Sequence, residues 1–230
     1  MRSCPARDLG RMDFAGAYAL QQRLVALRKQ GRIPDQLLFV EHPHVITMGR
    51  NGRAEHLLAD EHLLARAGIA FHSTDRGGDV TYHGPGQIVA YPIFDLREWK
   101  RDVAAYVRAL EEAVIAALAD FSINASRLEG CTGVWTGGAK ICAIGVHLSR
   151  WVSSHGLALN VDTDLSYFRY IIPCGLTKPV TSMRDLGAGA PRDKVIARLA
   201  VHFSRVFDIE VNWSRAGCLE PEEFVEETIA

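Results

Sequence analysis

The stretch CTGVWTGGAKICAIGVHLSRWVSSHGLALNV, residues 131–161, contains three short runs with β character. The runs cover residues 131–136, 139–148 and 152–161, and the sequence TGGA between the first two is typical of a tight hairpin. Strands joined by such short connections pair in antiparallel fashion. This stretch therefore predicts several neighbouring strands of an antiparallel sheet.

Helical and β patterns alternate in groups outside this stretch. Asp13 is a suitable N-cap for an apolar pattern that ends before Gly31, and further helices are predicted over 61–67, 102–121 and 193–207. Additional strands are predicted over 36–42, 45–48, 69–75, 79–83 and 87–96. Strict alternation of strand and helix is absent, and no repeat or linker divides the chain. We therefore expect an α+β fold with a mixed, largely antiparallel sheet flanked by helices, in a single domain over 1–230.

Composition limits the class of protein. The chain has 230 residues, 48% of them hydrophobic, and a formal net charge of -1. This balance argues against general attraction to nucleic acid or to a membrane. No apolar run approaches the ~18 residues of a membrane helix, and the N-terminus lacks the apolar region of a secretory signal. Scattered cysteines without a C-x-x-C pair indicate neither a disulfide framework nor a zinc site, so a cytoplasmic enzyme is expected.

Residues 76–87, RGGDVTYHGPGQ, place four glycines around Arg76 and His83. The pattern matches neither the dinucleotide-binding nor the phosphate-binding glycine loop. Two interpretations remain open from the residues alone. The segment is either a pair of turns around a short strand, or a surface whose bare backbone cradles an extended ligand.

Cys174 differs from the other cysteines because it lies between Pro173 and Gly175, which present it on a turn. Cys131 and Cys142 fall within β runs and are expected to be small buried hydrophobic residues. Lys140 begins the run 139–148, where an exposed lysine is the commoner situation. Simple alternation would place Lys140 on the same strand face as Cys142, Ile144 and Val146, opposite Ile141, Ala143, Gly145 and His147. His42 and His44 have no third ligand nearby in the sequence, so a metal site is not expected.

Three segments taken together closely resemble the lipoyl(octanoyl) transferase family. They are RGGDVTYHGPGQIVAY (76–91), GAKICAIGVHLSRWVSSHGLALNVDTDL (138–165) and PCG (173–175). The resemblance implies a fold similar to the catalytic domains of biotin and lipoate protein ligases. It also implies transfer of an octanoyl group from acyl carrier protein to a lysine of a lipoyl domain, the first step of protein lipoylation. Cys174 would be the nucleophile that forms a thioester, and Lys140 the cation that activates it.

The same resemblance implies the acyl contacts and the partners. The glycines of 76–87 would make room for an acyl chain, and the contacts would be Arg76, Gly77, Gly78, Asp79, Val80, Thr81, Tyr82, His83, Ala143, Ile144, Gly145, Gly156, Leu157 and Ala158. No cofactor, ATP or metal is implied. The donor would be octanoyl-acyl carrier protein, and the acceptors lipoyl domains of 2-oxoacid dehydrogenase E2 subunits and the glycine cleavage H protein. Neither nucleic acid nor membrane is expected as a partner.

Several alternatives remain at this stage. An amidotransferase between two lipoyl-bearing proteins would use the same thiol, whereas an ATP-dependent lipoate or biotin ligase would form an adenylate. A non-catalytic acyl-carrier-binding module would not need Cys174. His83 or His155 could replace Lys140 as the activating group, because cysteine–histidine pairs are common. Acidic partners would require a local cationic rim, for which Arg50, Arg53, Arg150 and Lys178 are candidates.

Overall fold

The computed structural model describes residues 1–172 and 178–213. Its helices are α1 (Phe14–Lys29), α2 (Glu61–Arg66), α3 (Val103–Ala119) and α4 (Arg192–Phe207). Its strands are β1 (Arg2–Arg11), β2 (Gln36–Glu41), β3 (Val45–Met48), β4 (Ala70–Ser73), β5 (Val80–His83), β6 (Gln87–Ile93), β7 (Ser126–Leu128), β8 (Cys131–Thr136), β9 (Ala139–Ser149), β10 (Val152–Asn160) and β11 (Ile209–Trp213). None of the helices in these residues is long and apolar enough to cross a membrane.

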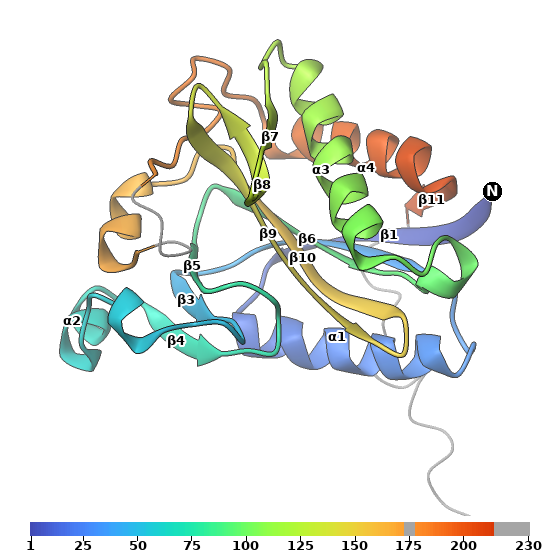
Figure 1. The fold of residues 1–230 in the computed structure, drawn as a ribbon, viewed down its shortest axis with the longest axis horizontal. Helices are drawn as coiled ribbons and strands as arrows, with labels where there is room; N and C mark the ends of the chain where they lie inside the picture. Colours follow the sequence, from blue (N-terminus) through green and yellow to red (C-terminus); the bar gives the residue numbers. More distant parts are fainter. Residues whose placement is uncertain (173–177, 214–230) are drawn as a thin grey trace, which may run out of the picture.

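The centre of the molecule is an eight-stranded sheet in the order β11-β1-β2-β6-β10-β9-β8-β7. Strand β1 pairs in parallel with β11 and β2, and the remaining pairs are antiparallel. The predicted hairpins over 131–160 form β8, β9 and β10 (Figure 1). The expectation of a mixed, largely antiparallel sheet is confirmed.

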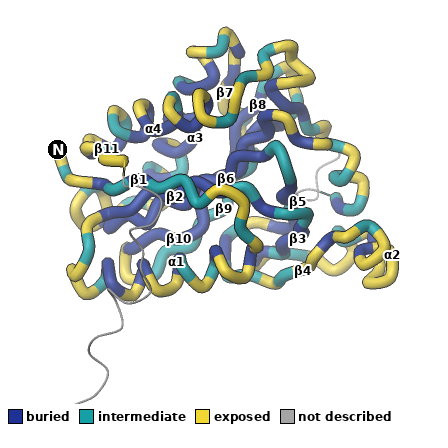
Figure 2. The backbone as a smooth tube through the Cα atoms, turned by 180° about the vertical axis from the view of Figure 1, so that it is seen from behind, coloured by how far each residue is buried: buried dark blue, intermediate teal, exposed yellow. Residues whose placement is uncertain are grey.

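Helices cover both faces of this sheet. Helices α3 and α4 pack on one face, where Leu37 and Phe39 of β2 join their apolar side chains in the largest core cluster. Helix α1 packs on the opposite face against Leu38 and Val40, the alternate residues of the same strand (Figures 1 and 2). Strand β2 is therefore buried on both sides, as its nearly continuous apolar sequence requires.

A smaller sheet, in the order β4-β3-β5, stands beside the α1 face together with α2. Its apolar side chains form a separate cluster that includes Ile46 of β3 and Val80 and Tyr82 of β5. Strand β5 and the loop that precedes it lie over β6, β9 and β10 of the large sheet. This arrangement creates the space that contains the candidate site.

Two sequence expectations need correction. Strand β9 is irregular opposite β8, where Val134 pairs with Cys142 but Trp135 pairs with Lys140. The extra residue, Ile141, shifts the alternation, so Ile141 and Cys142 both enter the large core cluster and Lys140 does not share the face of Cys142. Strands β1, β7 and β11 were not predicted: β1 carries three arginines and a proline, β7 has only three residues, and β11 follows directly after helix α4.

Candidate active site

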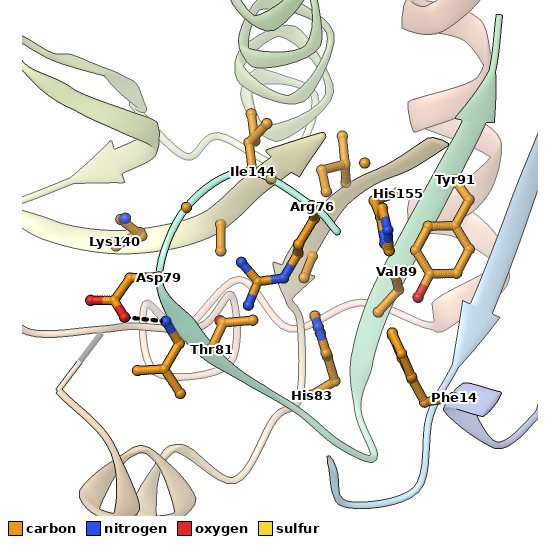
Figure 3. Close-up of a pocket in the computed structure, with 17 residues that line it drawn as sticks. Phe14, Arg76, Asp79, Thr81, His83, Val89, Tyr91, Lys140, Ile144 and His155 are labelled. Carbon is orange, nitrogen blue, oxygen red and sulfur yellow. Dashed lines mark hydrogen bonds between the residues drawn. The ribbon is translucent and has the colours of Figure 1, made fainter. Parts of the chain in front are cut away.

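A narrow pocket of about 50 Å³ lies between the α1 face of the large sheet and the loop leading into β5 (Figure 3). Side chains from β6, β9 and β10 form one wall, and residues 76–83 form the other. The described residues that line it are Phe14, Arg76, Gly78, Asp79, Val80, Thr81, His83, Val89, Tyr91, Lys140, Ala143, Ile144, Gly145, His155, Gly156, Leu157 and Ala158.

Most of the residues expected at the acyl site are thus brought to one pocket. Tyr82 is an exception, because it lies in the separate cluster beneath the small sheet, where its hydroxyl is 2.7 Å from His44 Nδ1. Gly77 is the other exception, since it lines a neighbouring groove instead. Whether the remaining residues contact an acyl chain stays a prediction.

Small residues bring the loop 76–79 close to the sheet. The N–H of Gly77 donates a hydrogen bond of 2.8 Å to the carbonyl of Val146 in β9. A Cβ on Gly145 would stand 2.9 Å from the carbonyl oxygen of Gly77, and a Cβ on Gly49 would stand 2.4 Å from that of Gly78. The loop therefore lies between two glycines that belong to other segments of the chain.

This packing revises the explanation of the loop glycines. Gly78 lines the pocket and has a φ of +86°, which favours glycine. A Cβ on Gly86 would instead meet the Asp162 carbonyl at 2.4 Å, and one on Gly84 would meet the side chain of Tyr82. Gly84 and Gly86 thus serve contacts within the protein, and the expectation that all four make room for a ligand is wrong.

Arg76 is buried beneath the loop, with 8% of its surface exposed. Its Nη2 donates to the carbonyl and hydroxyl oxygens of Thr47 at 2.6 and 3.0 Å, and its Nη1 donates to the Gly77 carbonyl at 3.1 Å. Arg76 is therefore not the solvated loop arginine that a simple pair of turns would contain. It ties β3 to the loop and presents a positive charge to the pocket.

Lys140 lies at one end of the pocket and is 8% exposed. Its Nζ is 4.8 Å from the centroid of the Trp135 ring, a cation–π contact. Its backbone N–H donates to the Pro179 carbonyl at 2.9 Å, and its carbonyl accepts from Thr181 N–H at 3.0 Å. The expectation of an exposed lysine at a strand end is wrong, since this ammonium is buried beside the pocket.

Cys174 and its neighbours Pro173 and Gly175 lie outside the described residues. On the two sides of residues 173–177, Ile172 N–H donates to the His56 carbonyl at 2.8 Å, and the Pro179 carbonyl accepts from Lys140 N–H at 2.9 Å. The segment that contains Cys174 is therefore connected on one side to residues hydrogen-bonded to β9 at Lys140.

The two histidines considered as alternatives to Lys140 both line the pocket. Burial, followed by the nearby charge of His42, lowers the pKa of His83 to about 3, so its ring is neutral near pH 7. Nδ1 of this neutral ring donates to Gln87 Oε1 at 2.8 Å, because the Gln87 amide nitrogen itself donates to Asn160 Oδ1. His83 is consequently a poor candidate for the cation that stabilises a thiolate.

His155 occupies a conformation unusual for a strand residue, with a φ of +55°. Its N–H donates to Gln21 Oε1 at 2.8 Å, and its Nε2 is 2.7 Å from Asp75 Oδ1, which also accepts from the Tyr18 hydroxyl. Burial lowers the pKa of His155, although the Asp75 carboxylate opposes this effect. Strained backbone of this kind is concentrated at functional sites.

Asp79 connects the pocket with the segment before α2. Its Oδ1 accepts from Val80 N–H at 2.8 Å, and its Oδ2 makes a close contact with Nδ1 of His56. His56 is also the residue whose carbonyl accepts from Ile172. Asp79 therefore stabilises the chain on one side of residues 173–177.

Sequence reasoning missed three lining residues, Phe14, Val89 and Tyr91. Phe14 is the first residue of α1, and Val89 and Tyr91 are alternate residues of β6. The alternation in β6 was visible in the sequence, but nothing in it indicated which face would meet the loop. Phe14 gave no signal because its position depends on the packing of α1 across the sheet.

A second, wider groove of about 460 Å³ adjoins the pocket. The two cavities share Gly78, Asp79, Lys140, Ile144 and Gly145. The groove is also lined by Val103 and Val107 of α3, by Gly130 in the turn before β8, and by Cys131 and Thr132 at the start of β8. The pocket therefore communicates with a surface groove at its Lys140 end.

The other described cysteines differ in exposure. Cys142 is fully buried, and burial raises its pKa to about 12. Cys4 is also fully buried, on β1. Cys131 is partly exposed and lines the groove, so the expectation that it is a buried hydrophobic residue is wrong. Within the described part of the chain, no group of three or more histidine, cysteine or acidic side chains is arranged to hold a metal ion.

The cationic residues proposed as a docking rim do not form one patch. Arg50 donates its N–H to the Arg76 carbonyl and Arg53 donates its N–H to Asp79 Oδ1, so both lie beside the loop. Exposed Lys178 precedes the residues bonded to Lys140. Arg150 is in the turn between β9 and β10, at the opposite end of β9 from Lys140 (Figure 1). The expectation is therefore wrong for Arg150.

Comparisons with known proteins give matches over most of the chain. The model of the lipoyl protein ligase A/B catalytic domain matches residues 13–204. A curated protein of Solibacter usitatus, named octanoyltransferase, is 64% identical over 211 residues, which cover 92% of this chain and 96% of that protein.

Solved structures show the same fold at lower identity. A bipartite lipoate protein ligase of Thermoplasma acidophilum is similar with a TM-score of 0.74 and 18% identity, over 92% of this chain and 86% of that one. A biotin protein ligase of Aquifex aeolicus gives a TM-score of 0.56 and 16% identity, over 89% and 70% of the two chains. The expected similarity in fold to both classes of ligase is confirmed.

Proposed function

The chain belongs to the octanoyltransferase family within the lipoyl protein ligase A/B catalytic domains, and from this premise we propose that it moves an octanoyl group from acyl carrier protein to a lysine of a lipoyl domain. Membership makes it an acyltransferase that acts in lipoylation. The donor, the acceptor residue and the covalent intermediate are the parts that we propose. The observation that carries the proposal is a buried ammonium, Lys140, at the open end of a narrow and largely apolar pocket.

In the first step, the Cys174 thiolate attacks the carbonyl carbon of the octanoyl thioester. A carbon–sulfur bond to Cys174 forms, the bond to the carrier's sulfur breaks, and the carrier leaves as a thiolate that takes up a proton. Exchange of one thioester for another costs little free energy. The Lys140 ammonium favours the thiolate form of Cys174 over the thiol, because a nearby positive charge lowers a thiol's pKa.

In the second step, the amine of the acceptor lysine attacks the Cys174 thioester. An amide bond forms, the Cys174 thiolate leaves, and the attacking nitrogen loses a proton. Lys140 is the proposed group whose positive charge stabilises the departing thiolate, which then takes up the proton that the attacking nitrogen loses; neutral His83 supplies no positive charge. Because the donor is already a thioester and the product is a stable amide, the scheme requires neither ATP nor a metal.

Features of the described residues support delivery of the acyl group on a long arm. The wide groove meets the pocket at Lys140, so a chain attached to a carrier can enter the pocket while its carrier stays outside. The proposed acceptors are the lipoyl domains of 2-oxoacid dehydrogenase E2 subunits and the glycine cleavage H protein. Arg53 and Lys178 are the proposed contacts with acidic partners beside this entrance.

The experiment that tests the proposal measures octanoyl transfer to a purified lipoyl domain. Octanoyl-acyl carrier protein without ATP should support transfer, and free octanoate with ATP should not. Transfer only from free octanoate with ATP would indicate a ligase. Transfer only from an octanoylated H protein would indicate an amidotransferase.

A further inference from the structure

The pocket crosses three neighbouring strands of the large sheet. Ala143 of β9 pairs with Ala158 of β10, and Ala158 pairs in turn with Val89 of β6. All three residues line the pocket, and the first two are small. Adjacent strands lie ~4.8 Å apart, so this row of residues is about 10 Å long from β9 to β6.

The two ends of this row differ. At the β9 end, Lys140 and Ile144 line both the pocket and the wider groove, so the pocket opens there. At the β6 end, Phe14 and Tyr91 line the pocket and are absent from the described residues around the groove. Figure 3 shows Lys140 and Phe14 on opposite sides of the pocket. The pocket therefore opens into the groove at Lys140, whereas Phe14 and Tyr91, which are 5% and 3% exposed, close its opposite end.

Phe14 is held firmly at the closed end. It begins α1, where the Asp13 carboxylate caps the helix by accepting from Gly16 N–H at 2.8 Å. The residue is buried, and its ring centroid lies 5.3 Å from that of His72 and 5.6 Å from that of His42. A ring packed between aromatic neighbours at the rigid start of a helix cannot move aside at little cost.

We propose that Phe14 is a specificity-determining residue that limits the acyl chain to about eight carbons. This proposal rests on the proposed function and adds which residue limits the length of the acyl substrate. A fully extended eight-carbon chain with ~1.5 Å bonds in staggered geometry measures about 9 Å, which matches the row from β9 to β6. A longer saturated chain would have to occupy the space that the Phe14 ring fills.

The test compares donors of six, eight, ten and twelve carbons on acyl carrier protein. Wild-type enzyme should show its highest kcat/KM with eight carbons. Phe14→Ala should move the optimum to ten or twelve carbons, because each further buried methylene strengthens binding about fourfold. Phe14→Leu should give a smaller shift in the same direction and covers the possibility that the alanine variant does not fold. Phe14→Trp should favour six carbons.

Ile144→Ala is the matched control. Ile144 lines the same pocket at its open end, so its truncation changes the rates but leaves eight carbons as the preferred length. Folded Phe14→Ala and Phe14→Leu enzymes that keep the wild-type preference would overturn the proposal while leaving the proposed function intact.

If no acyl transfer is observed, calorimetry with free fatty acids tests the assignment of Phe14 separately from the proposed function. Failure of the wild-type protein to transfer any acyl group refutes the proposed function, but the pocket length can still be measured. Affinity should rise up to octanoate and then stop rising in wild-type protein, and it should continue to rise with chain length in Phe14→Ala. Parallel curves for the two proteins would overturn the assignment of Phe14.

Discussion

Replacing Gly145 with alanine should separate the loop 76–79 from the large sheet. The φ of Gly145 lies outside the left-handed range, so only the new contact opposes the substitution. The added Cβ would stand 2.9 Å from the Gly77 carbonyl oxygen and 3.3 Å from Arg76 Cδ, whereas ordinary contact begins at 3.4 Å. The loop must therefore move by about 0.5 Å, and the hydrogen bond from Gly77 to Val146 must lengthen.

The expected loss of stability follows from these contacts. Overpacking costs ~1–3 kcal/mol, and replacing glycine regains ~0.4–1 kcal/mol through the unfolded state. A net loss of ~1–2 kcal/mol lowers Tm by about 2–8 °C in a chain of this length. Octanoyl transfer should fall at least ~10-fold, because displacement of a site by even ~1 Å can cost ~100-fold in rate.

Calorimetric unfolding and the transfer assay check this prediction together. Gly189→Ala is the control, since its Cβ would meet Arg184 Cα at 3.7 Å, an ordinary contact on an exposed loop. That variant should be slightly stabilised and fully active. Unchanged Tm and activity in Gly145→Ala would refute the account of how the loop is held.

Three further predictions concern charge. Lys140→Met should raise the pH midpoint for alkylation of Cys174 towards or above ~8.5, and His83→Asn should leave it unchanged; the reverse pattern would make histidine the activating group. Because burial lowers the pKa of His83 to about 3 from an unfolded value of 6.5, stability should fall as the pH falls between these values, by at most ~1.4 kcal/mol per unit. His83→Asn should reduce the pH dependence of the unfolding free energy measured in urea. An unaltered pH dependence would contradict the conclusion that the His83 ring is neutral. Finally, Arg53→Glu should slow transfer and weaken its salt dependence, whereas Arg150→Glu, at the far end of β9, should not; equal effects would exclude a docking surface beside the loop.

The core elements could be predicted from the sequence because their local patterns agree with their tertiary environment. The strands over 131–160 carry apolar runs, the first two of them joined by a Gly-Gly turn, and Asp13 caps α1 as expected. Strand β1 is different, since its fully buried residues are only Cys4 and Ala6 and the residues next to them are polar or proline. Its pairing with β2 and β11 arises from contacts over long sequence separations that local patterns do not record.

The candidate site could be predicted only in part. Motif resemblance brought residues 76–83 and 143–158 to the same region, and twelve of the fourteen named positions line the pocket. Simple alternation could not predict the irregularity at Ile141. This irregularity directs the Lys140 side chain towards the pocket. Phe14 was missed because it reaches the site through helix packing, and the roles of the glycines depended on neighbours such as Gly49 that lie elsewhere in the chain.

Intact mass spectrometry with octanoyl-acyl carrier protein, in the absence of ATP and of any acceptor, tests the central claim most directly. The account predicts that the protein gains one octanoyl group, that peptide mapping places it on Cys174, and that Cys142→Ser still acquires it. Cys174→Ala should acquire none and should transfer none to a lipoyl domain. An octanoyl group on another residue, or a Cys174→Ala enzyme that retains transfer, would contradict the account.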